Sequence, residues 1–286
     1  MIIWAIVLRC EWLLDYKQPG FIVVRDSIFV ENIYSPMILA AEKDFLIVFK
    51  PPGMHSAPLP KSGGGTMLDW CCLEFPEVGS LTGRREGEGG LLHRLDYETH
   101  GIMLLARTRE GMESLLLQQM EGKIAKKYSA MTTKTETKLP GFPDSAFDSL
   151  TIKSAFRAYG VGRKAVRPAP EGKKEYTTEV LSVKELGDNV YFFTTKILSG
   201  FRHQIRCHLA WAGYPIVNDK LYGGSELNDG CSSLRLYGWT QILGLRASSI
   251  AFADPSTGEK QEYSINLTNP TDKIPGSARG RQAKLD

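Results

Sequence analysis

Two short runs of apolar residues constrain the fold of this chain more than any other feature. The run FLIVF spans residues 45–49 and the run IMLLA spans residues 102–106. Both are shorter than an ordinary helix, and the first is rich in aromatic and β-branched residues and is stopped by a Pro-Pro-Gly sequence at residues 51–53. Runs this short and this uniformly apolar predict strands buried on both faces of a sheet.

Later segments show the alternation that is typical of half-buried antiparallel strands. We expect strands at TTEVLSVKEL, NVYFFTTKIL, KKYSAMTT, ASSIAFA and QEYSINL, which are residues 177–186, 189–198, 126–133, 247–253 and 261–267. Apolar residues at helical spacing predict helices within residues 66–75, 108–120 and 201–213, with Thr108 as a cap. The sequence therefore predicts an α+β fold with a mixed, mostly antiparallel central sheet flanked by helices and loops.

The chain of 286 residues is long enough for one substantial core. We divide it into an N-terminal lead-in at residues 1–35, one domain at 36–268 and a polar, basic tail at 269–286 that we expect to be disordered. Within the domain, residues 134–175 are rich in Pro, Gly and charge, and we predict a long, partly mobile insertion. Its basic residues predict either a solvated loop or an RNA-contacting arm; they are Lys153, Arg157, Arg163, Lys164, Arg167, Lys173 and Lys174.

Overall composition gives limited guidance on partners. A net charge of +3 permits nucleic-acid binding only through local concentration of positive charge. The apolar run at residues 2–8 is much shorter than the roughly 20 residues that span a bilayer, so we expect no membrane association. Five irregularly spaced cysteines indicate reduced thiols rather than a disulfide framework, which favours the cytoplasm.

Reactive side chains are concentrated in HRLD at residues 93–96 and GFRHQIRCH at residues 200–208, with Lys-Tyr at residues 127–128 as a third contributor. A carboxylate beside an arginine, such as Asp96 with Arg206, can act as a nucleophile or as a base. The ring of Tyr128 offers a flat face for a nucleobase. Phosphate and other RNA contacts are expected from the polar residues beside these groups, namely Arg94, Lys127, Arg202, His203 and Gln204.

Each of these residues also has a plainer interpretation. A single Asp beside an Arg is more often a structural ion pair, and a single Tyr is more often a core residue. His203 and His208 could suggest a metal, but a spacing of five turns a helix by about 500°, so the side chains would point about 140° apart. The sequence contains no metal-binding, phosphate-loop, dinucleotide or serine-hydrolase motif, and we predict neither a metal nor a cofactor.

At these residues the chain resembles the RluA-type pseudouridine synthases. Their motif of HRLD, two variable residues and TSG corresponds to HRLDYETHGIMLLA, and their later motif corresponds to GFRHQIRCHLAWAGYPIVNDKLYGG. EKDFLIVFKPPGMHSAPL, KKYSAMTT and ADPSTGE match further family segments. The matches follow the family's order across residues 38–265, and the lead-in is too short and insufficiently basic for the S4 RNA-binding domain of many relatives.

The resemblance implies the pseudouridine synthase fold with a catalytic cleft across the sheet, and an enzyme that isomerises uridine in tRNA or ribosomal RNA. Asp96 would attack the uridine or assist formation of a glycal intermediate, with Arg206 holding it charged and oriented. Tyr128 would stack on the base and assist proton removal, and Arg94 would enter the RNA stack vacated by the flipped nucleotide. No cofactor and no obligate protein partner are implied, and we expect a monomer.

Four positions depart from the family pattern. Phe201 replaces the usual arginine after glycine, Arg202 occupies the variable position, His100 replaces serine, and Asp254 stands where histidine is common. The alternative hypothesis is a non-catalytic RNA-binding or ribosome-assembly protein on the same scaffold. The presence of Asp96 favours the enzyme.

Overall fold

An eleven-stranded sheet organises the protein. The computed structural model describes residues 23–29, 32–59, 64–83, 85–144, 150–172, 174–225 and 241–266. The strands are β1 (Val23–Phe29), β2 (Met37–Ala41), β3 (Phe45–Lys50), β4 (His100–Ala106), β5 (Ala125–Thr133), β6 (Thr151–Tyr159), β7 (Ala165–Ala169), β8 (Tyr176–Gly187), β9 (Val190–Ile197), β10 (Leu245–Ala253) and β11 (Lys260–Asn266). The helices are α1 (Met67–Glu74), α2 (Pro76–Ser80), α3 (Arg109–Met120) and α4 (Gln204–Trp211), with a short 3-10 turn η1 (Val161–Arg163).

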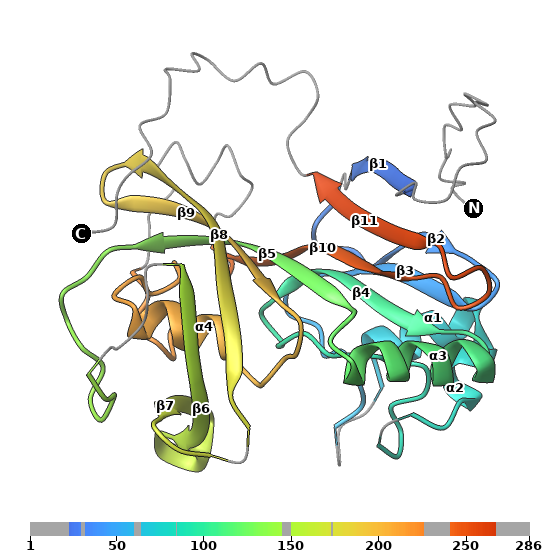
Figure 1. Ribbon diagram of the computed structural model, residues 1–286, viewed down its shortest axis with the longest axis horizontal. Helices are drawn as coiled ribbons and strands as arrows, with labels where there is room; N and C mark the ends of the chain where they lie inside the picture. Colours follow the sequence, from blue (N-terminus) through green and yellow to red (C-terminus); the bar gives the residue numbers. More distant parts are fainter. Residues whose placement is uncertain are drawn as a thin grey trace.

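The strand order is β2-β3-β4-β10-β5-β9-β8-β6-β7, and β11 pairs with both β10 and β1. Only the β4–β10 and β1–β11 pairs are parallel. Figure 1 shows α1, α2 and α3 beside the β2–β4 part of the sheet, and α4 beside β6 and β8 in the other part. The predicted α+β class with a mixed, mostly antiparallel sheet is confirmed.

The strands and helices predicted from periodicity are present at closely similar positions. The apolar run of β3 is buried along its whole length because successive side chains enter different apolar clusters. Leu46 and Val48 pack in one cluster with Tyr128, whereas Phe45 and Phe49 pack in the other. Thr108 caps α3 as predicted, since its hydroxyl accepts a hydrogen bond from the Gly111 amide at 3.0 Å.

The segment 134–175, which we predicted to be a long insertion, contains regular strands. It contains β6 and β7, and β6 changes partner along its length. Residues 151–154 pair with β8, whereas residues 155–159 pair with β7. The segment therefore ends in a β6–β7 hairpin that extends beyond β8, and Lys173 lies outside the described residues.

Two further predictions fall wholly or largely outside the described part of the chain. These are the disordered tail at 269–286 and most of the lead-in at 1–35, of which the structure describes β1 and residues 32–35. Among the described residues, no helix is long and apolar enough to cross a membrane.

One glycine permits the central parallel pairing. Gly101 on β4 lies in register with Ala247 on β10 and has a φ of +123°. A Cβ atom at this position would lie 2.3 Å from the Ala247 carbonyl oxygen, so any larger residue would force β4 and β10 apart. The short distance between these strands positions the loop that precedes β4.

We predict that Gly101→Ala lowers the free energy of unfolding by roughly 3–5 kcal/mol, through positive-φ strain and the steric clash with β10. Urea denaturation followed by circular dichroism measures this change. Gly258→Ala is the matched control, because Gly258 also has positive φ but nothing lies within 4 Å of the added Cβ. The Gly258→Ala control should lower the free energy of unfolding by only about 1–2 kcal/mol. Equal losses of unfolding free energy in the two variants would contradict the proposed clash.

Candidate active site

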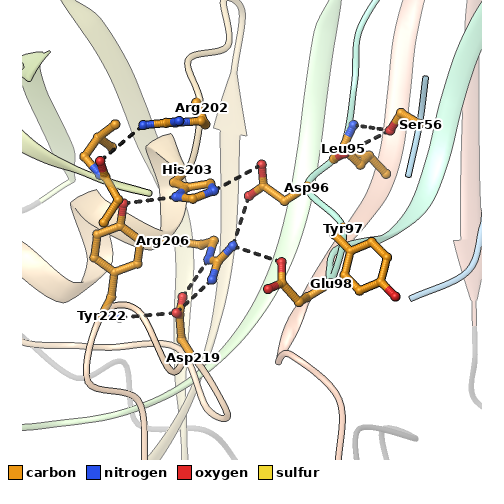
Figure 2. Close-up of polar contacts among 12 residues, drawn as sticks. Ser56, Leu95, Asp96, Tyr97, Glu98, Arg202, His203, Arg206, Asp219 and Tyr222 are labelled. Atoms are coloured by element: carbon orange, nitrogen blue, oxygen red, sulfur yellow. Dashed lines mark hydrogen bonds and ion pairs between the residues drawn. The ribbon is translucent and has the colours of Figure 1, made fainter. Parts of the chain in front are cut away.

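Asp96 lies in the loop that enters β4, and the segment after β3 holds this loop in place. The Ser56 hydroxyl donates to the Leu95 carbonyl at 2.9 Å and accepts from the Leu95 amide at 3.0 Å. One residue beyond Asp96, the Tyr97 carbonyl accepts from the Gly53 amide at 2.9 Å. The backbone on both sides of Asp96 is therefore fixed, and Figure 2 shows the Ser56–Leu95 contact next to it.

Lys50 supports the same loop from the buried end of β3. Its ammonium group donates to the carbonyls of Pro51 and Met54 at 2.8 and 2.7 Å, and to that of Tyr97 at 3.3 Å. Burial lowers the pKa of Lys50 to about 7, against the opposing influence of the Asp96 and Glu98 charges. The sequence signal for Lys50 was its position at the end of an apolar run, immediately before Pro-Pro-Gly. We did not assign this lysine a role.

Arg206 on α4 is the buried cation of the site. Its side chain is 2% exposed and makes a two-pronged ion pair with Asp219, with Nε to Oδ2 at 2.7 Å and Nη2 to Oδ1 at 2.9 Å. Burial by itself would lower the pKa of Arg206, but the hydrogen bonds and charge of Asp219, with the charges of Asp96 and Glu98, raise it above its ordinary value. The guanidinium is therefore permanently charged and fixed in orientation.

The remaining edge of this guanidinium faces two other carboxylates. Nη1 lies 3.4 Å from Asp96 Oδ2 and 3.4 Å from Glu98 Oε2. The side chains of Asp96 and Glu98 are 22% and 49% exposed, so both can be reached from solvent while Arg206 cannot. The predicted pairing of Asp96 with Arg206 is present, and Figure 2 shows Arg206 between Asp219 and this pair.

His203 contacts Asp96 from the other side. It precedes α4 with a left-handed backbone (φ +56°), and its Nε2 lies 3.8 Å from Asp96 Oδ1. Burial lowers the pKa of His203 despite the neighbouring Asp96 charge, which favours the neutral ring at neutral pH. Its Nδ1 lies 3.2 Å from the Tyr222 hydroxyl, which in turn accepts from the Val166 amide of β7 at 2.9 Å.

Tyr128 lies on β5, on the face of the sheet that packs against α4. It shares an apolar cluster with Leu95 and Ile205, the residues that precede Asp96 and Arg206 in the chain. Burial, with a smaller contribution from the Asp96 charge, raises the pKa of the Tyr128 phenol. The structure thus brings Tyr128, Asp96 and Arg206 together, and the phenol keeps its proton at neutral pH.

The residues predicted to contact RNA occupy different environments. Arg94 is half-exposed beside the loop of Asp96 and pairs with Glu88 at 3.1 Å. Lys127 lies next to Tyr128 on β5, with its side chain on the opposite face of the strand. It pairs with Glu262 of β11 at 2.8 Å, so its charge is directed away from Tyr128. Arg202 donates to the carbonyls of Arg163 and Ala165 in the β6–β7 hairpin, at 2.9 and 3.2 Å.

Gln204 is buried, which its position in the sequence did not reveal. It is 2% exposed; its amide oxygen accepts from the Phe201 amide at 3.0 Å, and its nitrogen donates to Thr177 and Thr178 of β8. The side chain therefore fixes the start of α4 against the sheet. It does not lie at the surface, where we predicted an RNA contact.

Asp219, Tyr222 and Glu98, like Lys50, are site residues that we did not predict. Asp219 and Tyr222 lie in the PIVNDKLYGG segment of the resemblance, and this was the signal that could have identified them. His208 is buried between Ser154 and Thr178, whose hydroxyl oxygens lie 3.0 and 2.9 Å from its ring nitrogens. Among the described residues, no group of His, Cys, Asp and Glu is arranged to hold a metal ion.

Comparison with known proteins identifies the same stretch of chain. The sequence profile described as RNA pseudouridylate synthase matches residues 44–211. An uncharacterized RNA pseudouridine synthase of Aquifex aeolicus is 27% identical over 228 residues, which are 80% of this chain and 68% of that protein. Ribosomal large subunit pseudouridine synthase C of Pasteurella multocida is 30% identical over 196 residues, 68% of this chain and 55% of that protein.

A solved structure shows the same fold at low sequence identity. The protein called human RNA Pseudouridylate Synthase Domain Containing 1 superposes with a TM-score of 0.56 and 21% identity. The alignment covers 82% of this chain and 84% of that chain.

The buried ion pair generates a prediction about stability. Asp219→Asn should lower the free energy of unfolding by roughly 3–5 kcal/mol, because it leaves the buried Arg206 guanidinium without its principal counter-charge. Glu98→Gln makes the same chemical change at a half-exposed partner of Arg206 and should cost less than about 1 kcal/mol. Chemical denaturation of both variants checks this, and similar losses would show that Asp219 is not the principal partner.

Proposed function

The chain belongs to the RNA pseudouridylate synthase family and is an RNA pseudouridine synthase, and we propose that Asp96 is its catalytic carboxylate. Half-exposed Glu98 is the other candidate at this place in the fold, but its side chain is held by a single contact to Arg206. Asp96 lies between two groups: Arg206 Nη1 is 3.4 Å from its Oδ2, and His203 Nε2 faces its Oδ1 at 3.8 Å, beyond hydrogen-bond distance. This position of a solvent-accessible carboxylate between Arg206 and His203 is the observation that carries the proposal.

The proposed reaction is a balanced isomerisation. The N1–C1′ bond of uridine breaks, the uracil turns within the site, and a C5–C1′ bond forms; the proton lost from C5 is matched by the proton gained at N1. Asp96 either attacks the ribose or removes a ribose proton to give a glycal, and the geometry is compatible with both. In either case Arg206 aligns the carboxylate, which both routes require.

Tyr128 is proposed to stack on the uracil beside Asp96. Since its phenol keeps its proton at neutral pH, the hydroxyl can donate a hydrogen bond to the base while the ring supplies the stacking surface. The target nucleotide must leave its stack to reach Asp96, at a cost of a few kcal/mol. Half-exposed Arg94 is close enough to Asp96 in the chain to occupy the vacated position.

The proposed substrate is uridine in tRNA or ribosomal RNA. The name of the Pasteurella multocida relative favours ribosomal RNA of the large subunit. We propose that the protein acts in the cytoplasm as a monomer with no obligate protein partner. Free thiols at Cys71, Cys72 and Cys207 are compatible with that compartment.

The experiment that tests the catalytic assignment is Asp96→Asn. This change should abolish pseudouridine formation while leaving RNA affinity within a few-fold of wild type, because it removes the reactive charge and keeps the side-chain shape. The release of tritium from RNA containing 5-tritiated uridine measures the reaction, because the C5 proton is lost. Glu113→Gln is the matched control: it removes a carboxylate from an exposed ion pair on α3 and should leave the rate unchanged.

Mapping of pseudouridine in tRNA and ribosomal RNA from cells with and without the gene identifies the substrate.

Full activity of Asp96→Asn would refute the assigned carboxylate. Loss of RNA binding in parallel with activity would indicate a contribution to binding instead.

A further inference from the structure

Positive charge is concentrated in the segment that forms the β6–β7 hairpin. Residues 150–176 contain seven Lys or Arg and two Glu, a surplus of five positive charges, whereas the whole chain has a net charge of +3. The rest of the chain is therefore slightly acidic. The side chains of Arg157, Arg163 and Lys164 are exposed near the hairpin tip, so this charge is available to a polyanion.

Hydrogen bonds connect the hairpin to the catalytic cluster. Arg202 donates to the carbonyls of Arg163 and Ala165, and the Val166 amide donates to the hydroxyl of Tyr222. That hydroxyl contacts His203, whose other ring nitrogen faces Asp96. The hairpin is thus held at a fixed position relative to Asp96, and Figure 2 shows this series of contacts from Tyr222 to Asp96.

An aromatic cluster lies between the hairpin and the catalytic cluster. Phe201 stacks on Phe156 of β6, with ring centroids 4.9 Å apart and planes inclined by 6°, and Phe156 also stacks on His208 at 4.9 Å. Tyr176, at the start of β8, is 5.0 Å from Phe201, and Lys174 lies over its ring. His208 is fully buried whereas Phe201 is 37% exposed, so the ring contacts lead from the core to solvent.

Phe201 is close in the chain to His203, which faces the proposed catalytic carboxylate. Phe201 precedes His203 by two residues, and two residues span at most about 7 Å of extended chain. Phe201 also stands where the family resemblance leads one to expect an arginine. An exposed aromatic ring at this place replaces a charged phosphate contact with a flat apolar face, which binds a base rather than a phosphate.

We propose that Phe201, backed by Phe156 and Tyr176, is a stacking platform for an unpaired base of the substrate RNA next to the target uridine. The phosphates of the same RNA strand then contact the basic β6–β7 hairpin. This inference rests on the proposed function for the identity of the ligand. It assigns a recognition surface to a residue at which the chain departs from the family pattern.

The test measures RNA affinity and turnover separately for a series of substitutions at Phe201. Phe201→Ala should weaken binding by roughly 5- to 150-fold, the range that corresponds to loss of one base–aromatic stacking contact. Phe201→Leu should show a loss of similar size although it retains apolar volume, whereas Phe201→Tyr should bind as wild type. The ligand is a uridine-rich single-stranded RNA that carries one 2-aminopurine, and stacking quenches its fluorescence.

Two controls keep this outcome interpretable. Tyr34→Ala removes a ring that is 63% exposed in the segment before β2, far from α4 in Figure 1, and should leave binding unchanged. Thermal melting of every variant reports whether packing against Phe156 is lost. Wild-type affinity and quenching in Phe201→Leu would overturn the proposal, because they would show that Phe201 serves only to fill space.

The affinity measurements are made in both wild-type and Asp96→Asn proteins. If wild type forms no pseudouridine in any RNA, the proposed function fails, yet the Phe201 series still decides whether the ring binds a base. If turnover proceeds normally and the Phe201 series has no effect on affinity or KM, only the platform fails. The two failures are therefore distinguishable.

The hairpin generates a separate prediction on salt dependence. Arg157→Gln with Lys164→Gln should reduce the slope of log affinity against log salt by about 1–2, as expected when one or two phosphate contacts are lost. The double variant should keep the Phe201-dependent quenching at low salt. Lys43→Gln, in the exposed β2–β3 turn, is the control, and an unchanged slope in the double variant would remove the hairpin from the RNA-binding surface.

Discussion

The ion pair between Arg206 and Asp219 is the interaction on which the geometry of the site depends. A guanidinium that is 2% exposed is costly to bury, and only a two-pronged pair with a fully buried carboxylate makes that burial tolerable. Asp219 also accepts hydrogen bonds from the amides of Leu221 and Tyr222, so the pair fixes the loop after α4 as well as the helix. Because Asp219 occupies Nε and Nη2 of the guanidinium in this way, the remaining nitrogen, Nη1, is directed toward Asp96 and Glu98.

This arrangement has an electrostatic consequence for substrate binding. Three carboxylates surround one guanidinium, so the immediate surroundings of Asp96 carry excess negative charge and repel an RNA phosphate. The positive charge that offsets this repulsion lies on the periphery, in the β6–β7 hairpin and at Arg94. Separating the two charges in space lets the RNA backbone be held at some distance from the carboxylate at the reactive position.

The sequence predicted those parts of the structure that depend on local pattern, and missed those that depend on tertiary contacts. The burial of β3 on both faces followed from FLIVF alone, and the proximity of Asp96 and Arg206 followed from motifs that the resemblance placed together. The hairpin was missed because Pro168 and its neighbouring glycines are typical of irregular chain. In the structure Pro168 lies on β7, the last strand of the sheet, where a missing amide donor is tolerated. Gln204 was misassigned because a polar residue beside catalytic candidates gives no sign of whether it faces RNA or β8.

The contact between Tyr222 and His203 shows how the hairpin and the carboxylate depend on each other. The Tyr222 oxygen accepts from the Val166 amide, which leaves its own proton available for Nδ1 of a neutral His203. The ring then carries its proton on Nε2, the atom that faces Asp96 Oδ1. Any displacement of β7 that moves Val166 consequently moves the hydroxyl that sets the tautomer of His203. The same hairpin that carries a local surplus of positive charge therefore influences the orientation of a group that faces Asp96.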